Sequence, residues 1–97
     1  MSIFAVEYVY GPEAEAERVE HRPKHRLWLA EQAAADVVLA SGPYADGAGA
    51  LLIFRAENEA AVQDLVSQDP MTKGGGVTGL KISGWNPVIG KLSSYVG

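Results

Sequence analysis

Near the start of the chain, hydrophobic and polar positions follow the two-residue period of a β-strand. Ile3 to Tyr10 is rich in β-branched and aromatic residues, and alternate side chains of a strand point to opposite faces. Gly11-Pro12 closes this run because both residues favour turns. The pattern therefore predicts a first strand over Ile3–Tyr10.

Helix-forming residues follow in two unequal segments. Glu13–Glu20 is acidic and predicts a short turn of helix. Pro23 lacks an amide hydrogen and suits a first turn, so we expect the main helix to begin near Arg22-Pro23 and to run to about Ala35. We expect one stripe of this helix to pack on a sheet, with a second stripe beside it. The first stripe is Leu27, Ala30 and Ala34, and the second is His25, Trp28, Leu29 and Gln32.

Two short apolar runs in the middle of the chain predict two more strands. Val37–Ala40 is wholly apolar and ends at Ser41-Gly42-Pro43, which is typical of a turn. Asp46-Gly47 supplies a second turn. Ala50–Phe54 then follows as a buried strand.

A second helix is predicted between Asn58 and Asp69. Asn58 suits the N-cap, and Glu57 and Glu59 suit the positive end of the helix dipole. The helix should stop at Asp69, because Pro70 pushes the residue before it out of the helical region. Its apolar face consists of Val62, Leu65 and Val66.

The last part of the chain predicts one more strand and a tail. Gly74-Gly75-Gly76 indicates a flexible or tightly turned connection, and the alternation over Leu80–Trp85 indicates the strand. The tail Asn86–Gly97 holds several apolar residues, so we expect it to pack on the body or on a partner subunit. Its expected anchors are Trp85, Ile89 and Leu92.

The order of these elements is strand, helix, strand, strand, helix, strand, which predicts an α+β fold. With right-handed crossovers it gives a ferredoxin-like βαββαβ antiparallel sheet with both helices on one face. The 97 residues form a single domain over 1–97. Because the chain has no further layer for the other face, we expect a second copy to cover it and form a homodimer.

Composition excludes several classes of partner. The net charge is −4, whereas nucleic-acid-binding proteins carry a basic face. The chain has no cysteine, which excludes disulfides and cysteine-ligated metals and fits a reducing compartment. There is no secretory signal and no apolar run of about 18 residues. We therefore expect a cytoplasmic protein with no nucleic-acid or membrane partner.

The densest polar cluster is His21–Arg26. Arg22 and His25 lie three residues apart and share a helix face, where cations beside an imidazole could bind a carboxylate or phenolate. The alternative is a solvated first turn that binds nothing. His21 and His25 have the spacing of metal ligands, but there is no His-Glu-x-x-His pattern, so no metal is predicted.

Two further features have a structural and a functional interpretation. Asp69 could fix the tautomer of an imidazole, as in acid–base dyads, or could only end its helix. Ser41-Gly42-Pro43 could line a pocket or could only end a strand. The glycines at 74–76 are not followed by Lys-Ser/Thr, so no nucleotide cofactor is predicted.

Taken in order, these motifs resemble the YciI-like, or YCII-related domain, family. The resemblance rests on Arg22-Pro23-Lys24-His25, Ser41-Gly42-Pro43 and Asp69-Pro70 with a following Gly-Val, and it spans Ile3–Trp85. It implies a dimeric α+β barrel in which two ferredoxin-like sheets pack face to face. It also implies a site in which His25 pairs with Asp69, Arg22 binds the substrate and Ser41-Gly42-Pro43 lines the pocket.

The resemblance also suggests a class of chemistry. The family is similar in fold to muconolactone isomerases, and a dehydrochlorinase of chlorinated hydroxyhydroquinones is its best chemical precedent. This implies acid–base catalysis by His25, oriented by Asp69, on a cyclic oxygenated substrate such as a lactone, phenol or quinol. The alternative is a binding module that holds a small organic anion in the same cavity without turnover.

Overall fold

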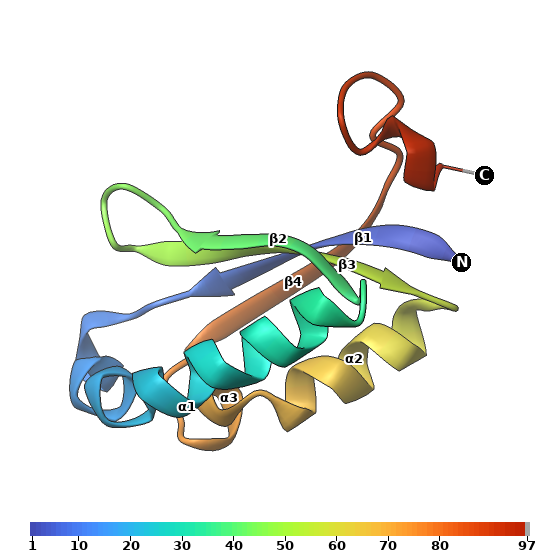
Figure 1. The fold of residues 1–97 in the computed structure, drawn as a ribbon. Helices are drawn as coiled ribbons and strands as arrows, with labels where there is room; N and C mark the ends of the chain where they lie inside the picture. Colours follow the sequence, from blue (N-terminus) through green and yellow to red (C-terminus); the bar gives the residue numbers. More distant parts are fainter. Residues whose placement is uncertain (97) are drawn as a thin grey trace.

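The computed structural model describes residues 1–96 and contains a four-stranded antiparallel sheet with helices on one face (Figure 1). Gly97, the last residue of the predicted tail, lies outside the described residues. The elements in chain order are β1 (Ser2–Val9), η1 (Pro12–Ala14), α1 (Glu15–Ala34), β2 (Val38–Pro43), β3 (Gly49–Ala56), α2 (Glu59–Gln68), α3 (Pro70–Lys73), β4 (Gly79–Trp85) and η2 (Ser93–Tyr95).

The strand order confirms the predicted ferredoxin-like fold. The sheet has the order β2-β3-β1-β4, and β1 pairs antiparallel with both β3 and β4. Helix α1 links β1 to β2, and α2 lies between β3 and β4 in the chain. Both helices cover the same face of the sheet (Figure 1). Among residues 1–96, no helix combines the length and apolar character that crossing a bilayer requires.

The hydrophobic core lies between the sheet and the two helices. Asn58 caps α2 as predicted, because its side-chain oxygen accepts a hydrogen bond from the Ala61 amide at 2.9 Å. The predicted apolar face of α2 is also correct, since Val62 and Val66 are buried and Leu65 is partly buried. The buried core cluster comprises Phe4, Val6, Tyr8, Val38, Ala50, Leu52, Phe54, Ala56, Val62 and Val66.

The predicted start of the first long helix is wrong. Helix α1 is continuous from Glu15 to Ala34 and carries Pro23 in its interior. Pro23 lies on the exposed side of the helix, so the ring points away from the sheet. The helix therefore continues through one missing hydrogen bond, because packing on the sheet supplies most of its stability.

The expected packing stripe of α1 is also wrong. Leu27 is 63% exposed, and Ala30 and Ala34 are exposed as well. The helix instead buries Arg18 and His25 and packs Trp28 and Leu29 against the core. Two polar residues interrupt the apolar period on the buried face, so hydrophobicity alone selects the wrong side.

Strand β2 is longer than the apolar pattern indicates. It runs from Val38 to Pro43, so Ser41-Gly42-Pro43 belongs to the strand and not to a turn. The register shifts between Val38 and Ala40, which is a bulge. Pro43 is tolerated because β2 is an edge strand, where one side of the backbone is unpaired.

A short helix, α3, follows α2 and was not predicted. Asp69 ends α2 and caps α3, since its side chain accepts from the Met71 amide. Gly74 then ends α3, and Gly75 has a φ of +82°, which glycine adopts without strain. The glycine run is thus a tight turn rather than a flexible linker.

The tail leaves the end of β4 on the face of the sheet opposite the helices (Figure 1). Pro87 is buried, and the Arg55 guanidinium lies 5.9 Å from the centre of the Tyr95 ring, so part of the tail packs on the body. The expected anchors behave differently from one another. Leu92 is partly buried, whereas Trp85 is exposed and Ile89 is 91% exposed in the single chain. Packing of these two residues on a partner stays a prediction.

Candidate active site

The centre of the candidate site is the carboxylate of Asp69, which is completely buried. Pro70 forces Asp69 into an extended conformation between α2 and α3, and this turns the side chain under α1. Its Oδ1 atom accepts from the Met71 amide at 2.9 Å and lies 2.7 Å from His25 Nδ1. Its Oδ2 atom accepts from the Tyr8 hydroxyl at 2.8 Å. A buried carboxylate needs such donors, and here three surround it.

His25 is held between this carboxylate and a cavity. The residue is 8% exposed, on the face of α1 that packs against the sheet. Because Nδ1 faces the Asp69 carboxylate, it carries the proton in the neutral ring, and Nε2 is left with the lone pair. The structure thus brings together two residues that are 44 positions apart in the chain.

The cavity has a volume of about 310 Å³, which suits a small organic molecule. Two arginines, Arg22 and Arg26, lie on its α1 side, and Ser41-Gly42-Pro43 of β2 lines it from the other side. The remaining lining residues are Tyr10, His25, Leu29, Ala50 and Met71. Of the predicted site residues, five line the cavity, and Asp69 supports His25 from behind.

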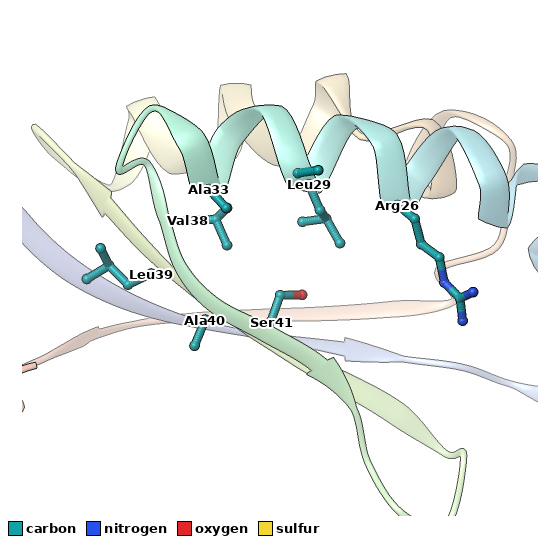
Figure 2. A pocket seen from close by; sticks show the side chains of 8 residues that line it. Arg26, Leu29, Ala33, Val38, Leu39, Ala40 and Ser41 are labelled. Carbon is teal, nitrogen blue, oxygen red and sulfur yellow. The ribbon is translucent and has the colours of Figure 1, made fainter. Parts of the chain in front are cut away.

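A second, more apolar hollow adjoins the first between α1 and β2. Figure 2 shows Leu29, Ala33 and Val38 close together there, with Arg26 and Ser41 toward one end. Arg26, Leu29 and Ser41 line both hollows. Ala30, which was expected to contact the sheet, instead lines this hollow.

Three residues of the site were not indicated by the sequence: Tyr8, Tyr10 and Met71. Arg26 already belongs to the predicted polar cluster His21–Arg26. Tyr8 and Tyr10 alternate along β1 and its extension, so both face the helices. The Arg18 guanidinium lies 4.9 Å from the centre of the Tyr10 ring and donates to the Gly76 carbonyl. Strand alternation alone would have placed the two tyrosines on one face, but no local pattern connects them with Asp69.

The two tyrosines remain protonated over the ordinary pH range. Burial raises the pKa of the Tyr8 hydroxyl far above its usual value, and the Asp69 charge raises it further, while the Thr72 hydroxyl acts in the opposite direction. Burial is also the main cause of the raised pKa of Tyr10, and the nearby Arg18 and Arg22 charges lower it in part. Tyr8 is therefore a permanent hydrogen-bond donor to Asp69.

His21 and Lys24, the other polar members of the predicted cluster, do not line this cavity. His21 Nε2 lies 3.7 Å from the Glu20 carboxylate, and the ring packs on Gly74. Lys24 is exposed. Among residues 1–96, no group of three or more His, Asp or Glu side chains is arranged to hold a metal ion.

The fold and site place this chain among ferredoxin-like α+β proteins with a cavity between the helices and an edge strand. The YCII-related domain model matches residues 3–86, and the chain belongs to that family. No curated protein matches the sequence.

Two solved structures show the likeness in three dimensions. One is the 5-chloro-2-hydroxyhydroquinone dehydrochlorinase TftG of Burkholderia phenoliruptrix AC1100, in complex with 2,5-dihydroxybenzoquinone. Its TM-score is 0.74 at 24% identity, over 86% of this chain and 92% of that one. The other is the C-terminal domain of MgtC from Mycobacterium tuberculosis, with a TM-score of 0.49, 16% identity and 88% coverage of each chain.

Proposed function

We propose that this protein is an enzyme that uses His25 and Asp69 for acid–base chemistry on a cyclic, oxygenated, anionic substrate of the lactone, phenol or quinol type. One observation carries the proposal. A buried carboxylate lies 2.7 Å from Nδ1 of an imidazole that also lines a cavity with two arginines. This arrangement leaves Nε2 to exchange a proton with a ligand, while Asp69 orients the ring.

The reaction that fits this arrangement is a proton transfer. Nε2 of His25 would accept a proton from a ring hydroxyl or an acidic C–H group, and Asp69 would stabilise the imidazolium. Arg22 would bind the anionic oxygen of the substrate, with Arg26 beside it. The imidazolium would then return its proton to another substrate atom or to a leaving group. Such a sequence moves no electrons to a carrier, so it needs no redox cofactor.

The comparison with TftG supports the choice of substrate class. That protein is named for its action on 5-chloro-2-hydroxyhydroquinone, and its structure holds 2,5-dihydroxybenzoquinone. Both molecules are small oxygenated rings whose size and acidity suit a cavity of about 310 Å³ with arginines at its wall. The class proposed here is therefore a ring with ionisable oxygens.

We also propose that the working form is a homodimer. The helices cover one face of the sheet, and the other face exposes Val9, Leu51 and Trp85 in the single chain. A second copy packed on this face would bury these side chains.

Binding and turnover by matched variants test the enzyme proposal. Calorimetry with 2,5-dihydroxybenzoquinone measures binding, and chloride release from 5-chloro-2-hydroxyhydroquinone without oxygen measures turnover. His25→Gln should lower turnover by about 10²–10⁴-fold while leaving binding of the quinone within a few fold. Arg22→Gln should instead weaken binding by about tenfold or more, because it removes a charge-assisted contact.

His21→Gln is the matched control, since it replaces the one other histidine and that residue does not line the cavity. It should leave both measurements unchanged. If the wild type binds the quinone but transforms no member of a panel of chlorinated quinols and lactones, the chain is a binding module. If the wild type binds none of these rings, the proposed substrate class is wrong.

A further inference from the structure

Tyr8 belongs to the Asp69 cluster, which consists of Tyr8, His25, Asp69 and Met71, but it does not line the cavity. Its side chain is 1% exposed, and its hydroxyl donates to Asp69 Oδ2 at 2.8 Å across 61 positions of the chain. His25 and the Met71 amide both use the other oxygen, Oδ1. Tyr8 is therefore the partner of the carboxylate oxygen that the imidazole does not use.

We propose that Tyr8 is a positioning residue that acts on His25 through Asp69: its hydroxyl holds the carboxylate in place and draws negative charge toward Oδ2. The hydroxyl would thereby offset part of the attraction between the Asp69 carboxylate and a protonated imidazole. The effect of Tyr8 on the protonation of His25 is inferred from the hydrogen bonds alone. Only the consequence for catalysis rests on the proposed function.

The direction of the effect follows from the orientation of the O–H dipole. The hydrogen of the Tyr8 hydroxyl points at Asp69, so its positive end faces the carboxylate and, behind it, the imidazole. A positive charge on the ring is disfavoured by this dipole, and the negative charge of Asp69 favours it. Removing only the hydroxyl should therefore make the pair take up a proton at higher pH.

The other charged groups near the His25 ring also affect how readily it takes up a proton. On α1, Arg22 and Arg26 line the cavity beside His25, and their positive charges oppose a third cation. On the β1 side, Tyr10 lines the same cavity as a neutral phenol and lies against Arg18. At the junction of α2 and α3, Asp69 is the acid in direct contact. Tyr8 modulates that single negative charge.

The test is an NMR titration of the imidazole nitrogens, which requires no substrate. The chain has two histidines, so His25 is assigned by comparison with His21→Gln, and His21 serves as the internal reference. Tyr8→Phe keeps the ring and removes one oxygen atom. The midpoint of the His25 titration should rise by about one pH unit in this variant, and the midpoint of His21 should not move.

Tyr44→Phe is the matched control, because Tyr44 also donates its hydroxyl to a carboxylate, Glu7 Oε2, at 2.6 Å on an exposed part of the sheet. It should leave the His25 midpoint unchanged. A folded Tyr8→Phe variant whose His25 midpoint is unchanged or lower would overturn the proposal and leave Tyr8 as a core residue.

A second variant decides the question if Tyr8→Phe does not fold. Incorporating 3-fluorotyrosine at position 8 keeps the hydroxyl and makes it a stronger donor, so the His25 midpoint should move downward. An unchanged midpoint there would also reject the proposal. Because neither titration measures turnover, a chain that transforms no quinol still reports on Tyr8, and failure of the proposed function stays distinguishable from failure of this inference.

Discussion

Asp69 ends helix α2 and caps helix α3. Its carboxylate is also in hydrogen-bond contact with the Tyr8 hydroxyl, His25 Nδ1 and the Met71 amide. Pro70 explains the first property, because it excludes Asp69 from the helical region. Complete burial explains the second, because an ionised oxygen without a donor would be strongly unfavourable inside the protein. The residue that ends α2 is therefore also the residue that contacts His25 in the candidate active site.

The raised pKa of Tyr8 predicts a loss of stability in alkali. Unfolded tyrosine ionises at a pKa of about 10, whereas burial holds the folded hydroxyl protonated to higher pH. Above pH 10 the unfolded state therefore binds fewer protons, and the free energy of unfolding falls by up to about 1.4 kcal/mol per pH unit for this group. Below about pH 10 the contribution of Tyr8 is fully present.

Urea unfolding between pH 8 and 11 measures this effect. The wild type should lose stability above pH 10, and Tyr8→Phe should lose less, so the difference between the two proteins should narrow as the pH rises. Tyr10 also has a raised pKa, so some decline should persist in the variant. A difference that stays constant across this range would contradict the prediction.

Pairing of β1 with both β3 and β4 fixes the position of Tyr8 in the site. Tyr8 lies opposite Ala50 in β3 and opposite Leu80 in β4, so two hydrogen-bonded neighbours hold it beneath the helices. Gly49, next to Ala50, packs so closely on the Tyr8 backbone that a Cβ atom would collide with the Tyr8 carbonyl oxygen. The backbone of β1 cannot move aside without shifting the site.

Gly49→Ala should therefore destabilise the protein by about 1–3 kcal/mol, as overpacking in a rigid interior does. Gly84→Ala is the control, because a Cβ there meets no atom within 4 Å. It should be neutral or stabilise the fold by up to about 1 kcal/mol, since alanine lowers the conformational entropy of the unfolded chain. Thermal or urea unfolding of the pair checks this, and equal losses in both variants would refute the explanation.

At the scale of the whole molecule, the sheet is covered on one side only (Figure 1). Leu51, the third residue of β3, is 38% exposed on the open face and borders a shallow hollow with Ala5, Glu7, Lys81 and Ser83. The tail lies on the same side of the sheet (Figure 1). Its residue Ile89 is almost fully exposed. These apolar side chains are the ones that a second copy would bury.

The proposed homodimer predicts a particle of twice the 10.3 kDa chain mass by light scattering. Leu51→Lys should convert it to the monomer, because a charge would then lie in the buried interface. Leu27→Lys is the matched control, since Leu27 is exposed on α1 at the other side of the sheet. A wild type that scatters as a folded monomer at micromolar concentration would reject the dimer.

Local signals in the amino-acid sequence are enough to predict the order of the main helices and strands and the residues that begin or end several of them. Strand alternation, the Asn58 cap and the stop at Asp69-Pro70 are local signals, and each depends on torsion angles and hydrogen bonds within a few residues. Family motifs in the sequence also single out His25 and Asp69. Their proximity follows from the fold, and their role in catalysis is a proposal.

The buried face of α1 and the contact between Tyr8 and Asp69 depend on long-range packing and cannot be predicted from local sequence. Helix α1 passes through Pro23 and buries Arg18 and His25, because contacts with distant elements outweigh its local preferences. From the sequence alone, Tyr8 is predicted only to be a residue of the first strand. It becomes a donor to Asp69 because the sheet and the α2–α3 junction bring together groups 61 positions apart, and no short-range pattern encodes such a contact.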